Sequence, residues 1–249
     1  MGLRHRLLIA VVVGGVVAGS TATYLANAAV ETTVVAASPS ASPGPTRSEI
    51  RFPFEGESLG GDLAVSAIAG GAVRPEARDT GQAVRFPPRC RIYAGRSCPR
   101  VVLESREIPN PGTGPVRFGA AVLMEADDTD AGENVLQKGF SRGHGQFKLQ
   151  VDGVAGQPSC VLVGTGSSRI FVVTARGSVA DGWWHGIECV RTGSDFSIAV
   201  DGTILGRTRV PASLSIVNSD PLRIGGKGLS PNNDQFHGAI DDVFVVIGG

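Results

Sequence analysis

Residues 146–163 read QFKLQVDGVAGQPSCVLV, and this stretch decides the fold class. Between residues 147 and 151, apolar Phe, Leu and Val alternate with polar Lys and Gln, which is the pattern of a strand with one buried face. An Asp-Gly pair at 152–153 is typical of hairpin turns, and a second β-prone run follows at 159–163. The stretch therefore predicts an antiparallel hairpin.

The same alternation recurs on both sides of this hairpin. Toward the C-terminus it occupies residues 187–191 and 196–200, and an Asp-Gly pair follows at 201–202. Toward the N-terminus, apolar runs occur at 50–54, 82–86 and 116–126. The chain has 35 glycines and 15 prolines, and no long helical periodicity follows residue 30. Short strands separated by frequent turns predict an all-β fold, a two-sheet antiparallel sandwich.

The charged residues show no excess of either sign, because 23 basic side chains balance 23 acidic ones. Proteins that bind nucleic acids usually gather positive charge on one face. Here Lys and Arg are scattered singly among acidic residues. No nucleic-acid partner is expected.

The N-terminus has the features of a secretory signal. Arg4 and Arg6 precede an apolar and Gly run at 7–18, and Ala-Asn-Ala at 26–28 fits a cleavage site. Cleavage after Ala28 predicts a secreted, extracellular protein. The alternative is an uncleaved anchor on the outer face of the cytoplasmic membrane, because the 19 residues from 7 to 25 just suffice to span a bilayer. Membrane contact is expected only through this segment.

The chain is predicted to have three parts. Residues 1–28 are the signal peptide or anchor, and residues 29–48 form a linker whose Ser, Pro and Ala cannot bury a core. Residues 49–249 form one domain. Export places this domain in an oxidising compartment, where cysteines usually pair.

Four cysteines lie in the domain, and they permit three pairings. We favour Cys90 with Cys98, which closes a short loop, and Cys160 with Cys189, which staples two later strands. A zinc site is the alternative. It is disfavoured because the chain has no C-x-x-C pair and only His185 lies near a cysteine.

Several segments, in order, resemble signatures of laminin-G-like domains of the concanavalin A-like lectin and glucanase superfamily, secreted bacterial type. They are residues 134–139, 146–150, 184–187 with 196–202, and 236–243, and residues 52–56 and 83–87 fit the start of such a domain. The resemblance covers about residues 49–249 and implies a jelly-roll sandwich. Because the superfamily contains lectins, adhesion modules and glycosidases, the fold does not choose a function.

The resemblance also implies a structural calcium site near the rim of the sandwich. Glucanase relatives use the Asp that begins the last strand, here matched by Asp241, and the expected partners are Glu55 and Gly56, through side chain and carbonyl. Such hard oxygen ligands suit calcium. The alternative is a buried Asp241 that is satisfied by backbone N–H groups or by an arginine.

An acidic cluster at 125–130 raises the question of catalysis. Laminarinase-like relatives carry an E-x-D-x-x-E strand, and Glu125 with Asp127 imitates its first half. Carboxylates at positions i and i+2 of a strand share one face, as a retaining glycosidase needs. The third position is Asp130 instead of Glu, so a solvated acidic turn is the preferred interpretation.

Two adjacent tryptophans are the remaining candidates for ligand binding. The resemblance places Trp184 in the core, which leaves Trp183 free to offer an aromatic face to a sugar. We therefore expect a secreted or cell-surface binding module, without catalysis, that recognises a glycan or an extracellular protein. The alternatives are a structural cell-envelope protein and a glucanase-type glycoside hydrolase.

Overall fold

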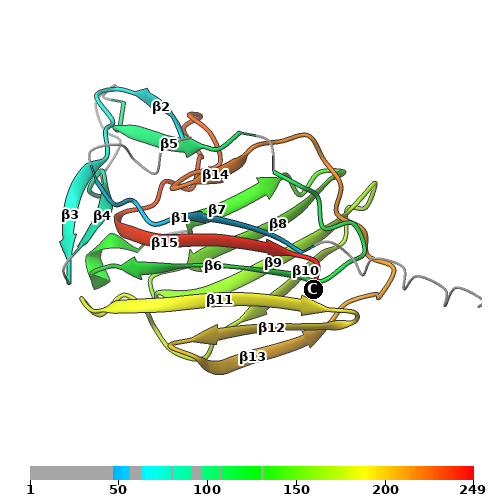
Figure 1. The fold of residues 1–249 in the computed structure, drawn as a ribbon. Helices are drawn as coiled ribbons and strands as arrows, with labels where there is room; N and C mark the ends of the chain where they lie inside the picture. Colours follow the sequence, from blue (N-terminus) through cyan, green and yellow to red (C-terminus); the bar gives the residue numbers. More distant parts are fainter. Residues whose placement is uncertain (1–46, 57–62, 80, 91–96, 107, 130–131) are drawn as a thin grey trace, which may run out of the picture. The chain divides into compact units, whose positions relative to one another are not determined.

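A computed structural model describes residues 47–56, 63–79, 81–90, 97–106, 108–129 and 132–249. The signal, the anchor and most of the linker lie outside the described residues, so the expectations about them stay predictions. Within the described ranges, no helix is long and apolar enough to cross a membrane. These residues form two antiparallel sheets, which confirms the all-β sandwich (Figure 1).

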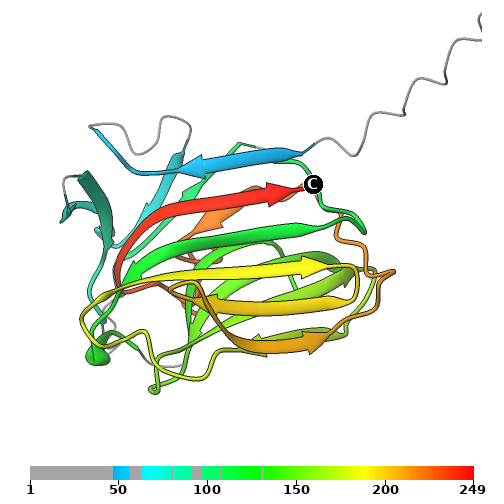
Figure 2. The ribbon, with the colours of Figure 1, turned by 60° about the horizontal axis from the view of Figure 1, so that its bottom comes forward.

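The eight-stranded sheet is organised around the last strand of the chain, β15. Its order is β13 (Thr203–Arg209), β12 (Asp195–Val200), β11 (Trp184–Thr192), β6 (Val116–Leu123), β15 (Gly238–Ile247), β4 (Gly81–Phe86) and β3 (Arg74–Arg78). One edge of β15 pairs first with β4 and then with β1 (Ser48–Phe52). Figure 2 shows β1, β15, β6, β11, β12 and β13 following one another across this sheet.

The seven-stranded sheet contains the hairpin that decides the fold class. Its order is β10 (Ile170–Thr174), β9 (Gln157–Thr165), β8 (His144–Asp152), β7 (Glu133–Gly139), β14 (Leu222–Ile224), β5 (Arg100–Glu104) and β2 (Ala64–Ile68). Strands β8 and β9 pair from His144 opposite Thr165 to Asp152 opposite Gln157. The turn between them contains Gly153, whose φ of 63° favours glycine.

The core lies between the two sheets and is built from the alternation seen in the sequence. Phe147 and Leu149 of β8 are fully buried, and Lys148 between them points to the other face of the sheet. Phe118 of β6 meets Phe147 across the interface, with ring centroids 4.9 Å apart. Each such buried side chain contributes roughly 1.5–3 kcal/mol.

Both expected disulfides are present. Cys90 pairs with Cys98 between β4 and β5, and Cys160 pairs with Cys189, with Cα atoms 5.9 Å apart. Cys160 belongs to β9 and Cys189 to β11, so this second bond joins the two sheets through the core.

The apolar run at 116–126 is shorter as a strand than the sequence predicts. Strand β6 ends at Leu123, and a short 3-10 helix, η1, occupies Ala126–Asp128. The Glu125 N–H donates to the Asp128 carboxylate at 3.1 Å. This local hydrogen bond favours a turn over a continued strand.

We expect removal of the inter-sheet disulfide to destabilise the domain more than removal of the other one. The Cys160–Cys189 bond closes a loop of 29 residues and the Cys90–Cys98 bond a loop of 8, so loop-closure entropy predicts losses of about 3–4 and about 2–3 kcal/mol. Urea unfolding of C160A/C189A and of C90S/C98S measures both. A smaller loss for C160A/C189A would contradict the stapling role of the inter-sheet bond.

Candidate functional site

The outer face of the eight-stranded sheet carries an open groove of about 620 Å³. Small residues at outward positions, Ala121 of β6, Gly186 of β11 and Ala199 of β12, line it. Their inward neighbours, such as Ile187 and Ile198, belong to the core. Because the groove has small residues along it, there is room for a ligand above the sheet.

Larger polar and aromatic side chains flank this groove. They are Arg51, Arg78, Glu188, Asp201, Asp242 and Phe244. The Phe244 ring packs against the backbone of Gly119, where an added Cβ would come within 2.9 Å of the ring. Two guanidinium groups, those of Arg51 and Arg117, lie 5.5 and 5.4 Å from the ring centroid. The groove therefore combines an aromatic ring with charged hydrogen-bonding groups.

Arg78 of β3 connects three side chains at one end of the groove. Its Nη1 donates to Asp241 at 2.6 Å and to Asp242 at 2.7 Å. Its guanidinium also lies over the Trp184 ring, 4.8 Å from the centroid, in a cation–π contact. Nothing in the sequence singled out Arg78, because the β3 segment lacks apolar alternation.

A β-bulge explains how consecutive aspartates reach the same guanidinium. In a regular strand, neighbouring side chains point to opposite faces. The pairing of β15 with β6 shifts register between Asp241 and Phe244, and Asp242 has a φ of 47°. The bulge turns both carboxylates toward Arg78, at the point where β15 changes partner from β4 to β1.

Asp241 and Glu55, two of the residues expected to bind calcium, have other hydrogen-bond partners in the structure. The Asp241 carboxylate holds Arg78 and accepts the Asp242 N–H at 2.7 Å, while Glu55 accepts the Gln82 N–H at 3.1 Å. Gly56 lies in a turn with a φ of 82°. Among the described residues, no group of three or more His, Cys, Asp or Glu is arranged to hold a metal ion. Calcium stays a prediction, and the geometry of Asp241 favours the arginine alternative.

Burial raises the pKa of the Asp241 carboxyl, and the hydrogen bonds from Arg78 and from the Asp242 N–H only partly offset this effect. The Arg78 guanidinium supplies the positive charge that the buried carboxylate needs. A metal ion at the same oxygen would have to displace this guanidinium.

The two tryptophans differ in exposure. Trp183 is 74% exposed, as a ligand-binding role requires, and its backbone N–H donates to the Asp181 carboxylate at 3.0 Å. The expectation that Trp184 lies in the core is wrong: it is half-buried at an outward position of β11, beneath Arg78. The inward positions of β11 belong to Ile187 and Cys189, two positions apart, so Trp184 falls on the opposite face.

The acidic cluster at 125–130 does not have the geometry of a catalytic strand. Glu125 precedes η1 and Asp127 lies within it, so these carboxylates are not at i and i+2 of a strand. Asp130 lies outside the described residues. The expected turn is confirmed, and the strand arrangement that the glucanase hypothesis requires is absent from the described part of this cluster.

His185 bridges two carboxylates at the same end of the sheet, a role that the sequence did not indicate. Its Nδ1 lies 2.7 Å from Asp201 and its Nε2 lies 3.1 Å from Asp181. Burial lowers the pKa of His185, but the hydrogen bonds to Asp201 and Asp181 outweigh burial and raise it above the ordinary value of 6.5. Asp201 also accepts the Gly186 N–H, so this cluster ties the turn at 201–202 to the start of β11.

Comparison with known families is consistent with this architecture. A family model, Laminin_G_3, described as "Concanavalin A-like lectin/glucanases superfamily", matches residues 109–246, more than half of the chain. The chain belongs to this superfamily. The resemblance that the sequence motifs carry is thereby confirmed. A search of curated proteins gave no match.

Solved structures with a similar fold include a neurotoxin structure and a domain of an enzyme. One comes from work on botulinum neurotoxin type C, whose cell entry depends on two ganglioside molecules. It has 10% identity and a TM-score of 0.55, over 80% of this chain and 47% of that chain. Another is domain 4 of AbnA, a GH43 extracellular arabinanase from Geobacillus stearothermophilus, in complex with arabinotriose. It has 13% identity and a TM-score of 0.53, over 80% of this chain and 91% of that chain. The chain thus spans about half of the toxin chain, and at these identities the likeness shows the fold alone.

We expect the stability of the domain to depend on the protonation of His185. The folded-state pKa is raised, so the stabilisation is fully present below pH 6.5 and is lost as the pH rises through the folded-state pKa. The Tm of the wild type should therefore fall across this window, whereas H185Q should show a flatter profile. Thermal unfolding between pH 5 and 9 tests this, and identical profiles for the two proteins would contradict it.

Proposed function

We propose that this chain is an extracellular, non-catalytic binding module that holds a glycan in the groove on the outer face of the eight-stranded sheet. The observation that carries the proposal is the groove itself, which combines a surface of small residues with the Phe244 ring and with charged groups. The proposed location is outside the cell, either after secretion or through an N-terminal anchor on the outer face of the cytoplasmic membrane.

The chemistry of the groove suits a saccharide. A sugar ring has apolar C–H faces that pack on aromatic rings and hydroxyl groups that need both donors and acceptors. Phe244 supplies a ring, while Glu188 and Asp201 supply acceptors. Arg51 and Arg78 supply donors. Trp183, exposed one residue before Trp184, is proposed to extend the binding surface.

The known relatives support a binding role. Domain 4 of the arabinanase, which this chain matches over most of that domain's length, was solved with arabinotriose. The toxin structure concerns interaction with gangliosides, and a related binding domain was solved in complex with rat synaptotagmin II. Because that partner is a protein, an extracellular protein stays the alternative occupant that we propose for the groove.

The groove proposal predicts that neutral oligosaccharides such as arabinotriose bind the intact protein and perturb residues of β11, β12 and β15. F244A should weaken binding at least about tenfold, because a central aromatic contact often dominates such sites. W183A is the safer second variant, since its side chain is exposed and its loss should not affect folding. NMR titration measures both.

V172A, an exposed apolar residue of β10 on the other sheet, is the matched control and should bind like the wild type. A saccharide panel that leaves the groove residues unperturbed would count against the glycan proposal. An extracellular protein that binds the wild type but not F244A would then favour the adhesion alternative.

A further inference from the structure

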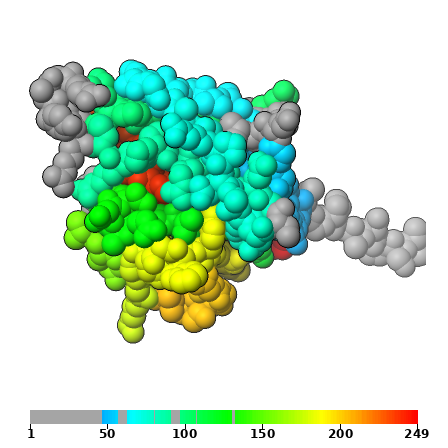
Figure 3. All heavy atoms as spheres, turned by 90° about the vertical axis from the view of Figure 1, so that its left-hand side faces the viewer, coloured from blue at the N-terminus to red at the C-terminus, as the bar shows by residue number. Residues whose placement is uncertain are grey.

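A second cavity, of about 410 Å³, lies at the end of the sandwich where β5, β7 and β15 begin. Its lining includes the Cys90–Cys98 disulfide, Arg100, Asn233, Asp234 and His237, and it shares no residue with the groove. Figure 3 views this end of the domain, where red atoms from the C-terminal part of the chain are visible between neighbouring green segments.

Arg100 is a buried cation that the chain itself barely satisfies. Arg100 lines the cavity, and the residue is only 6% exposed. Its one hydrogen bond to described residues runs from Nη1 to the Leu229 carbonyl at 3.5 Å, and no carboxylate among them pairs with it. Because its other guanidinium N–H groups have no hydrogen-bond partner among the described residues, they remain able to donate to an anion that enters the cavity.

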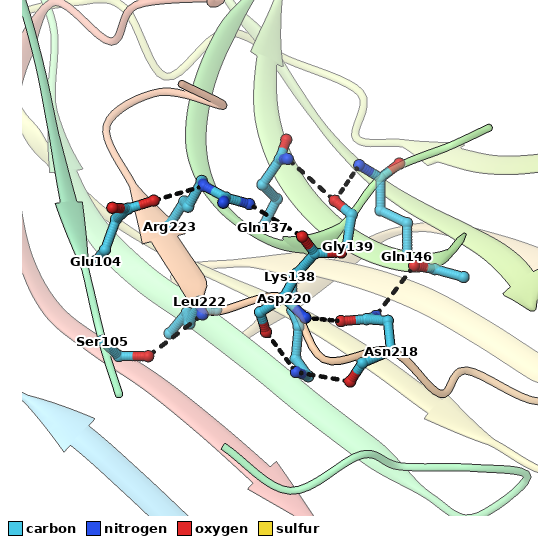
Figure 4. Close-up of polar contacts among 11 residues, drawn as sticks. Glu104, Ser105, Gln137, Lys138, Gly139, Gln146, Asn218, Asp220, Leu222 and Arg223 are labelled. Carbon is cyan, nitrogen blue, oxygen red and sulfur yellow. Dashed lines mark hydrogen bonds and ion pairs between the residues drawn. The ribbon is translucent and has the colours of Figure 1, made fainter. Parts of the chain in front are cut away.

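Two other buried cations show how this chain satisfies charges that have only a structural role. Arg191 donates to the carbonyls of Gly193, Gly114 and Ala212 at 3.0–3.1 Å. Lys138 donates to the carbonyls of Asn218 and Asp220 (Figure 4). Both side chains are enclosed by backbone oxygens. Arg100 has no such enclosure.

The charge around the second cavity is also unbalanced. Asp234 is the carboxylate in its lining, and it already pairs with Lys148 at 3.2 Å and with Lys227 at 2.9 Å. Asp234 is therefore already neutralised by two lysines, and the Arg100 charge has no carboxylate partner among the described residues. An anion in the cavity would gain from this field.

We propose that this cavity binds an oxyanion, the carboxylate or sulfate group of a small acidic ligand, and that Arg100 receives it. A planar guanidinium presents paired donors that match two oxygens of such a group. Asn233 and His237 also line the cavity, where Asn233 donates to Gln235 and His237 forms a hydrogen bond with the Pro87 carbonyl. The site is separate from the glycan groove and does not depend on it.

The test is a titration of the full protein with sodium glucuronate and, separately, with sodium sulfate, at constant ionic strength. Glucose is the uncharged control for glucuronate. Amide NMR shifts should move around Arg100 and Asn233 with an anion and not with glucose. The tighter of the two anions identifies the carboxylate or the sulfate as the preferred group. R100M keeps an unbranched apolar stem and removes the guanidinium, so it should weaken anion binding at least about tenfold.

Stability separates a binding role of Arg100 from a structural one. R100M should leave the Tm of the ligand-free protein unchanged or raise it, because it removes an uncompensated buried charge. R191M, the matched control, should lower the Tm, because it leaves three buried carbonyls without their donor. Unchanged anion affinity in R100M, or a fall in its Tm like that of R191M, would overturn the proposal. F244A should leave anion binding intact, so the two binding proposals fail or succeed separately.

Discussion

The buried interface between the two sheets fixes where all the chemistry of this domain can lie. Inward positions of β8 and β6 carry Phe147 and Phe118, and the Cys160–Cys189 bond crosses the same interface. Because side chains alternate along a strand, every second residue is assigned to the outer face once its neighbour is buried. A shift of one residue in β11 would bury Gly186 and Glu188 and expose Cys189, which would remove the groove and the inter-sheet bond together.

This alternation also explains how much of the fold the sequence could predict. The β8–β9 hairpin and the strands at 187–191 and 196–200 were predicted because each alternates cleanly and each is bounded by a turn signal. Strand β3, with the sequence RPEAR, carries no apolar alternation and lies at the edge of its sheet, so only its pairing with β4 defines it. Arg78 is the last residue of that strand, and this residue at the end of the groove was therefore missed.

The candidate site shows a second limit of sequence patterns. The sequence identified Asp241 as a candidate site residue, but its partner depends on a β-bulge that no local sequence motif predicts. Trp184 was misplaced for a related reason: its identity favours burial, whereas its register relative to Ile187 and Cys189 sends it outward. In both cases the contact that decides the role comes from Arg78, more than 100 residues away in the chain. Single-sequence reasoning can nominate such residues, but only tertiary pairing assigns their partners.

The ion pairs of Arg78 with Asp241 and Asp242 can take the structural role that a bound cation has in other proteins. They supply positive charge to a buried carboxylate, and they hold the bulged strand β15 against β3. A guanidinium adds what a metal ion lacks, a flat face, and here that face covers Trp184. The same side chain thus links the stability of the bulge to the shape of the groove end. A ligand that packs against Trp184 would therefore also contact the residue that keeps the last strand in its register.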